Sequence, residues 1–247
     1  MNPKFVGLSI FAIVISFIGG FMLANSLNKS EMARSSNVGA NSPEPKPQIP
    51  AEASDTNLSK EEIAARIAEA DQNPSNISYQ KSLGFALYKY AGMKQDAELL
   101  LEVTRLLNRV YESDPKDYDV LVALGNCFFD AGLIQKNDQT FKNSKKYYLE
   151  ALAIKPADLD VVADIGLIYA LSTPPDNVKA IIEFKKALKS DPNHERSLQA
   201  IVQAHISLKN ITEAEKFMAR LQKANPQNLR IPDFQKQLSA QPSSESK

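Results

Sequence analysis

A Leu-Gly or Ile-Gly step recurs along this 247-residue chain, and prolines punctuate the chain at a similar spacing. The steps are Leu83-Gly84, Leu124-Gly125 and Ile165-Gly166, and the prolines are Pro74, Pro115, Pro156, Pro192 and Pro226. Successive prolines are 41, 41, 36 and 34 residues apart. A unit of that length cannot bury its apolar face alone, so it must stack on its neighbours. The spacing predicts a solenoid of helical pairs, which offers a binding surface and no reaction of its own.

The charge balance argues against one class of partner. Lys+Arg and Asp+Glu each number 29, so the formal net charge is zero. A domain that binds nucleic acid normally carries a basic excess that neutralises phosphates. Nucleic acid is therefore not expected as a partner.

The N-terminal segment, residues 1–28, is predicted to be a transmembrane anchor. Residues 5–28 contain no ionisable side chain, and the apolar run from Phe5 to Leu23 approaches the roughly 20 residues that cross a bilayer. A cleaved signal peptide is the alternative, although its apolar region should be only about 7–15 residues long. Three small residues share one face of the predicted span, so it either self-associates or simply faces lipid. They are Ser16, Gly20 and Ala24.

The orientation of the anchor is weakly encoded. A count of flanking Lys and Arg would hold the following domain in the cytoplasm, but few of these charges lie near the span and long domains translocate regardless. The prediction is a single-pass inner-membrane protein whose C-terminal domain is extracytoplasmic.

Residues 29–57 are predicted to form a disordered linker. The segment is rich in Ser, Asn and Ala and contains Pro43, Pro45, Pro47 and Pro50, a composition that cannot build a core. A random coil of this length reaches about 30 Å. It would hold the next domain clear of the bilayer.

The ordered part is predicted to begin at residue 58. Residues 58–76 contain one helix, with Ser59 as its cap and Asn73-Pro74 at its end. Four units of two helices follow, at residues 77–117, 118–158, 159–194 and 195–228. Residues 229–247 contain a short helix from Ile231 to about Ser239 and a polar tail.

The units resemble tetratricopeptide repeats, whose first helix carries a Leu-Gly pair and an aromatic residue and whose second helix carries Ala, an aromatic residue and Ala before a proline. The best copy contains Ile165-Gly166, Tyr169, Ala180, Phe184, Ala187 and Pro192. The resemblance implies an all-α fold, a right-handed solenoid of helical hairpins. The 41-residue period would also suit HEAT-type repeats, but the later units shorten while keeping these marks.

Two units depart from the pattern. The first has bulkier residues in its second helix, and the fourth has Val202, His205 and Leu221 where glycine, an aromatic residue and alanine are usual. The fourth unit therefore resembles a terminal cap. The second unit holds extra residues at Gln135–Gln139, which lengthen either a loop or a helix.

No chemical site emerges from the motifs. The two histidines, His194 and His205, are not near a cysteine or in a metal-ligand spacing, and Cys127, in a helix expected over 118–131, is interpreted as a packed small hydrophobe. Asp160 and Asp164 are one helical turn apart and are interpreted as solvated charges. No phosphate-binding loop or hydrolase motif occurs, so no cofactor, no metal and no enzymatic activity are predicted.

The resemblance implies that the first helices line a concave face that binds a protein or peptide. The candidate partner-binding residues are Lys81, Phe85, Tyr88, Asn126, Phe129, Asp130, Asp160, Leu167, Arg196, Gln199 and Gln203. The aromatic side chains of Phe85 and Phe129 serve either as groove anchors or as packing. Some family members clamp a terminal carboxylate with Lys and Asn, but Asp160 and Asp164 would repel it here.

The sequence thus predicts a membrane-anchored adaptor. Its organisation is similar to that of bacterial factors of c-type cytochrome maturation, although no residue is specific to that pathway. A periplasmic chaperone or envelope-assembly factor and a regulatory subunit of an enzyme complex are the alternatives.

Overall fold

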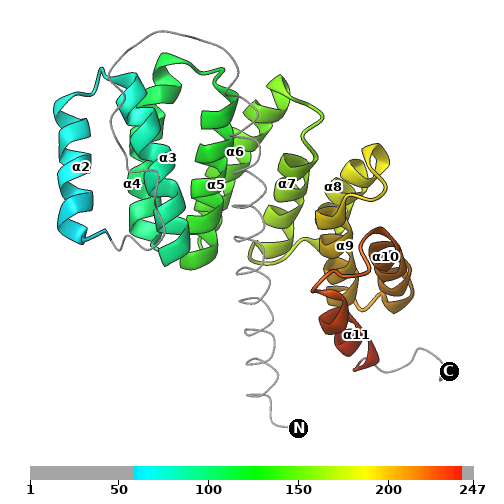
Figure 1. The fold of residues 1–247 in the computed structure, drawn as a ribbon. Coiled ribbons are helices and arrows are strands. Elements are labelled where there is room, and N and C mark those ends of the chain that lie inside the picture. Colours follow the sequence, from blue (N-terminus) through cyan, green and yellow to red (C-terminus); the bar gives the residue numbers. More distant parts are fainter. Residues whose placement is uncertain (1–57, 241–247) are drawn as a thin grey trace. The chain divides into compact units, whose positions relative to one another are not determined.

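The computed structural model describes residues 58–240, where the chain forms helices and no strand (Figure 1). The helices are α2 (Lys60–Gln72), α3 (Ile77–Lys94), α4 (Ala97–Ser113), α5 (Tyr118–Gln135), α6 (Asp138–Ile154), α7 (Leu159–Leu171), α8 (Asn177–Ser190), α9 (Glu195–Ser207), α10 (Ile211–Ala224) and α11 (Ile231–Ser239). The chain divides into two compact units, Met1–Ile67 and Ala68–Lys247, and the second contains α3 to α11. The predicted anchor and linker lie outside the described residues.

Short polar residues start most of the helices, as local capping chemistry requires. At the start of α2, the Ser59 hydroxyl accepts a hydrogen bond from the Glu62 amide, and the Glu62 carboxylate accepts one from the Ser59 amide, which is a complete capping box. Six later helices begin with an Asn or Asp side chain that accepts a backbone N–H of the first turn. These caps are Asn76, Asp96, Asp117, Asn137, Asp158 and Asp176.

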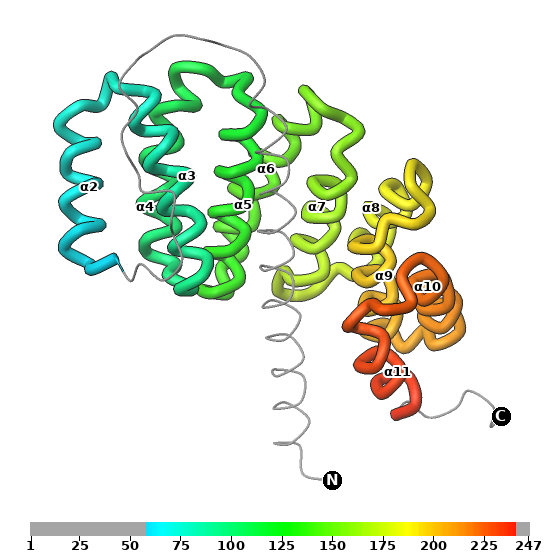
Figure 2. The backbone as a smooth tube through the Cα atoms, in the orientation of Figure 1, coloured from blue at the N-terminus to red at the C-terminus, as the bar shows by residue number. Residues whose placement is uncertain are grey.

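The prolines end the units as predicted. Each of α2, α4, α6, α8 and α10 ends two residues before one of the recurring prolines. Proline disfavours helical backbone in the residue before it and lacks the N–H that would continue the ladder. The chain then turns and begins the next helix, as the tube in Figure 2 shows.

The extra residues of the second unit lengthen its helices. The α5 and α6 helices contain 18 and 17 residues, whereas α7 and α8 contain 13 and 14. The helix expected over 118–131 therefore continues to Gln135, and this boundary was wrong. Leu133 and Ile134 are partly buried and extend its apolar pattern, and Lys136 ends the helix in the left-handed conformation with φ 52°.

Glycine allows the two helices of a pair to cross closely. A methyl group on Gly166 of α7 would overlap the Phe184 ring of α8, and one on Gly125 of α5 would overlap the Tyr148 ring of α6. Phe184 and Tyr148 are almost completely buried. The glycine and the aromatic ring thus fill one space between two backbones, as the sequence pattern predicted.

Successive pairs stack mainly through the contacts of α4 with α5, α6 with α7 and α8 with α9, and also through contacts between the first helices of neighbouring pairs. We call α3, α5, α7 and α9 the first helices and α4, α6, α8 and α10 the second helices. Each first helix contacts the next one, α3 with α5, α5 with α7 and α7 with α9, and α11 contacts α9 in the same way. Among the described residues, successive second helices make weaker contacts at most. The side formed by the first helices, here named the first-helix face, is therefore the tighter side of the stack.

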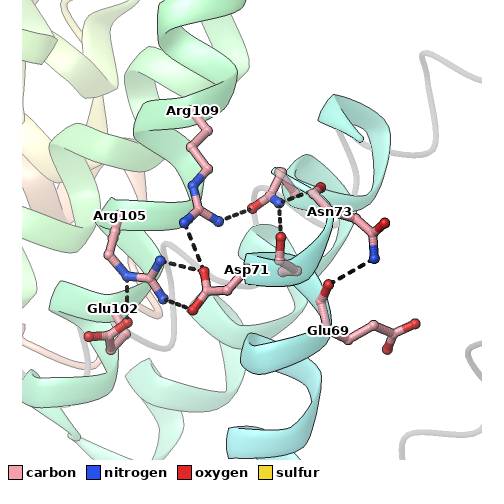
Figure 3. A network of polar contacts seen from close by, with 8 residues as sticks. Glu69, Asp71, Asn73, Glu102, Arg105 and Arg109 are labelled. Carbon is pink, nitrogen blue, oxygen red and sulfur yellow. Dashed lines mark hydrogen bonds and ion pairs between the residues drawn. The ribbon is translucent and has the colours of Figure 1, made fainter. Parts of the chain in front are cut away.

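The C-terminal end of α2 is held on α4 by a polar network (Figure 3). The Arg105 guanidinium forms a two-pronged ion pair with Asp71, at 2.6 and 3.0 Å, and Arg109 lies 2.8 Å from the same carboxylate. These hydrogen bonds lower the pKa of Asp71, first through Arg105 and then through Arg109. Gln80, which is fully buried in α3, donates to the Ala70 carbonyl at 2.6 Å.

Two side chains that the sequence analysis interpreted as structural, Cys127 and His205, are buried. Cys127 is fully buried in α5, as predicted. His205 is also buried, its ring stacks on Phe217 with centroids 5.5 Å apart, and burial lowers its pKa. No helix within residues 58–240 is long and apolar enough to span a bilayer.

We expect Gly166→Ala to destabilise the array, although alanine is the better helix former. The added methyl group must displace the Phe184 ring, and overpacking of this kind costs about 1–3 kcal/mol. Urea unfolding followed by helical circular dichroism measures the change in the free energy of unfolding.

Gly92→Ala is the matched control. Nothing lies within 4 Å of the methyl group that this change would add to α3. The helix propensity of alanine should then dominate and stabilise the protein by about 0.5–1 kcal/mol. Equal effects of the two substitutions would contradict the close-crossing explanation.

Candidate partner-binding face

The structure places all eleven predicted residues on the four first helices. Three lie on α3, three on α5, two on α7 and three on α9. Spacings of three and four residues bring them onto one side of each helix. The contacts between successive first helices then join these sides into the first-helix face.

Four of the eleven residues are buried within the array. Phe129 and Leu167 are each 2% exposed, and the Phe129 ring packs against Phe141 with centroids 5.7 Å apart. Asn126 accepts a hydrogen bond of 2.8 Å from the Tyr148 hydroxyl. Asp130 accepts a hydrogen bond of 3.3 Å from the Tyr88 hydroxyl. In this conformation these side chains pack between helices, so Phe129 acts as packing.

The other seven residues are partly exposed on the first-helix face. They are Lys81, Phe85, Tyr88, Asp160, Arg196, Gln199 and Gln203. The Lys81 ammonium group lies 6.0 Å from the centroid of the Phe85 ring. Gln203 of α9 donates to Gln237 of α11 at 3.2 Å. The accessible surface therefore combines aromatic rings at α3 with amides at α9.

The capping aspartates of two first helices have a second role that sequence reasoning missed. Asp117 caps α5 and forms an ion pair with Lys81 of α3, and Asp158 caps α7 and accepts a hydrogen bond from the Tyr118 hydroxyl of α5. Burial and this hydrogen bond raise the pKa of Tyr118. The Asp before α5 and the Asp before α7 each signal a cap in the sequence, but their contacts with the preceding unit depend on the stacking.

An ion-pair network joins α7 to α9. Arg196 contacts the carboxylates of Asp160, at 3.3 Å, and of Asp164. Asp164 is 1% exposed, so its interpretation as a solvated charge was wrong. A buried carboxylate needs a charged partner or strong hydrogen bonds, and Arg196 supplies both.

His194 completes this network at the start of α9. Its Nε2 atom lies 3.4 Å from Asp160 and its Nδ1 atom lies 2.8 Å from the Ser197 hydroxyl. The hydrogen bond from His194, followed by the charge of Arg196, lowers the pKa of Asp160 well below its usual value. The carboxylate therefore stays ionised and links two repeat units.

The described part of the chain contains no cluster of potential metal ligands. Within residues 58–240, no group of three His, Cys, Asp or Glu side chains could hold a metal ion. The polar groups of the first-helix face instead form hydrogen bonds and ion pairs with each other. What they offer a partner is contact and hydrogen bonding.

Comparison with known proteins identifies the repeats. Residues 125–158 and 176–238 match tetratricopeptide repeat models. Two crystal structures of MamA have the same fold, with TM-scores of 0.52 and 0.51 at 20% sequence identity. The similarity covers 68% of this chain and 90% and 84% of the two MamA chains. No curated protein sequence matches this chain.

These findings define an all-helical array that contains tetratricopeptide repeats. The MamA likeness, at 20% identity, concerns the fold alone. Repeats of this kind are typically scaffolds for protein interactions. The first-helix face is therefore the candidate site for a protein partner.

We expect Arg196→Met to destabilise the array strongly. It removes the guanidinium partner of the buried Asp164, and breaking a buried ion pair costs about 3–5 kcal/mol. Asp164→Asn in the same background should restore part of the loss, as a double-mutant cycle in urea would show. A loss below about 0.5 kcal/mol would contradict a structural role for this pair.

The same substitution should make the protein more sensitive to acid. Because the folded pKa of Asp160 is lowered, its stabilising contribution is present above the unfolded value of about 3.9 and is lost as the pH falls towards the folded pKa. Without Arg196, one cause of the lowered pKa is gone. The midpoint of acid unfolding should therefore move to higher pH.

Proposed function

We propose that this protein is a non-enzymatic, membrane-anchored adaptor that binds a protein or peptide partner on its first-helix face. The observation that carries the proposal is the continuity of that face, which runs through contacts from α3 to α9 and on to α11. A surface built in this way can bind an extended or helical segment along several repeats.

The exposed residues of the face favour a segment with apolar anchors. Phe85 and Tyr88, one turn apart on α3, are partly exposed and can accept an apolar side chain. Gln199 and Gln203, one turn apart on α9, can form hydrogen bonds with a peptide backbone. The ion pairs of Lys81 and Arg196 neutralise charge on the face, which disfavours a highly charged ligand.

The membrane attachment belongs to the proposal and is supported by sequence alone. The apolar segment at residues 5–28 would anchor the chain in the inner membrane, and residues 29–57 would tether the array on the extracytoplasmic side. Self-association through Ser16, Gly20 and Ala24 is a further part of this hypothesis.

Maturation of c-type cytochromes is one pathway that suits such an adaptor. The support is the order of an apolar segment, a Pro-rich stretch and a repeat array. An envelope chaperone would differ by binding many unfolded clients weakly. A regulatory subunit of an enzyme complex would bind one folded partner and change its turnover.

Phe85→Ala should weaken partner binding without unfolding the array. Truncation of an aromatic anchor costs about 2 kcal/mol or more, which is about a thirtyfold loss of affinity. A photo-cross-linking residue at position 203 in intact cells identifies the partner, and titration of that purified partner measures the loss.

Leu101→Ala is the matched control for this test. Leu101 is a 36% exposed residue on α4, a second helix outside the proposed face. Its truncation should leave the affinity unchanged. If both substitutions weaken binding equally, or if neither does, the partner does not use the first-helix face.

Membrane orientation has its own test. We expect external protease to digest the array in spheroplasts but not in intact cells, and the mature protein to keep its N-terminus. Cleavage after Ser26 would remove the anchor, and protection from protease in spheroplasts would place the array in the cytoplasm.

A further inference from the structure

A second surface lies on the second helices α6 and α8. Large hydrophobic side chains are exposed on α6 and α8, where Leu149, Val178 and Ile182 are 51%, 61% and 51% exposed. None of them lies on a first helix. The first-helix face therefore does not account for their exposure.

These side chains alternate with lysines along one side of each helix. On α8, Val178, Ile182, Lys185 and Lys189 follow one another at spacings of four, three and four residues, and all are exposed. Such spacings place side chains on one face of a helix.

The α6 helix has the same spacing of exposed residues, with lysine where α8 has an aliphatic residue and leucine where α8 has lysine. Lys142, Lys146 and Leu149 have the same spacing of four and three residues, and all are exposed. Both helices end two residues before their prolines, which are 36 residues apart, so Lys146 corresponds to Ile182 and Leu149 to Lys185. Leu149, Val178 and Ile182 thus each correspond to a lysine on the other helix, namely Lys185, Lys142 and Lys146.

The two helices flank the same aromatic ring. The ammonium group of Lys145, on α6, lies 4.5 Å from the centroid of the Tyr169 ring, and that of Lys179, on α8, lies 5.8 Å from it. Tyr169 belongs to α7, which packs against both helices. The α6 and α8 helices therefore both reach one ring of α7, and their exposed sides together are named here the basic outer face.

Positive charge is concentrated on these two helices. Together they contain seven lysines and three acidic residues, in a chain whose formal net charge is zero. One of the three, Glu183, is bound by Lys186 at 2.8 Å. The neighbouring α4 has three glutamates and two arginines, so the excess does not extend over it.

We propose that the basic outer face binds the surface of an anionic lipid bilayer. Lysine can lay its aliphatic stem along an apolar surface while its ammonium group reaches a lipid phosphate. Exposed Val, Ile and Leu side chains can enter the interface between these contacts. The combination suits headgroups above an apolar layer.

Nucleic acid and acidic proteins suit this face less well. The two helices contain no arginine, the residue that pairs bidentately with phosphates and carboxylates. Their most exposed apolar side chains are aliphatic, whereas binding of single strands relies on aromatic stacking. A lipid surface uses both the lysines and the aliphatic groups.

This inference does not depend on the partner-binding function. It also does not require the N-terminal anchor, because the face would contact vesicles whether or not the chain is already attached to them.

The test places a polarity-sensitive fluorophore on the full-length chain at Ile182→Cys. The single native cysteine, Cys127, is fully buried, so labelling is directed to the new thiol. We expect a blue shift with vesicles that contain 30% phosphatidylglycerol in phosphatidylcholine and none with phosphatidylcholine alone. About 0.5 M salt should reverse the shift, because it screens the lysines.

Leu101→Cys on α4, labelled in the same way, is the positional control and should show no shift. Attachment through the N-terminal segment alone would leave both probes in water, so the local signal separates the two modes of membrane contact. Equal responses at the two positions, or no response at position 182 to anionic vesicles, would overturn the proposal.

A second pair of variants tests the charge. The combined change of Lys142→Gln, Lys185→Gln and Lys189→Gln should raise the lipid concentration that gives half of the fluorescence shift about a hundredfold. Lys116→Gln, Lys223→Gln and Lys236→Gln remove as much charge from exposed positions elsewhere and should have little effect. A shift caused by polyglutamate or an oligonucleotide, and not by anionic vesicles, would assign the face to another class of partner and reject ours.

Discussion

The close crossing of two helices around a glycine is the constraint on which the array depends. Gly125 and Gly166 leave room for the rings of Tyr148 and Phe184, and those rings fill the space that a larger residue would occupy. The α5–α6 and α7–α8 pairs are thereby fixed at close approach. Such pairs stack in series, and stacking brings four first helices into contact on one side.

That stacking gives the first-helix face two roles. Its buried polar groups hold successive units together, as the contacts of Arg196 with Asp160 and Asp164 show. Its partly exposed groups, such as Phe85 and Gln199, remain available to a partner. A change at the face can therefore act through stability or through binding, and the two effects must be measured separately. The second helices carry a different chemistry, lysine and exposed aliphatic side chains, which we assign to a lipid surface.

Much of the fold could be predicted because its signals are local. Prolines two residues beyond the helix ends, Asn and Asp caps, and the short helix from Ile231 to Ser239 all follow from neighbours in sequence. The end of α5 was missed because Gly132, directly after Ala131, is typical of a helix end, whereas here it lies inside α5 and its missing side chain leaves room for the Phe141 ring. The buried state of Cys127 followed from its apolar neighbours and was confirmed.

The candidate site was less predictable. The sequence alone determined the repeat unit and the helices that carry the candidate residues, because the proline that ends each unit, and the glycine and aromatic residue of the second and third units, act within one unit. Only the tertiary structure decided that Phe129 and Leu167 are buried, that Asp164 is paired with Arg196, and that Phe85 remains partly exposed. Those outcomes depend on how the helices pack in three dimensions, because Phe129 meets Phe141 of the next helix and Asp164 meets Arg196 of the next unit, 32 positions along the chain.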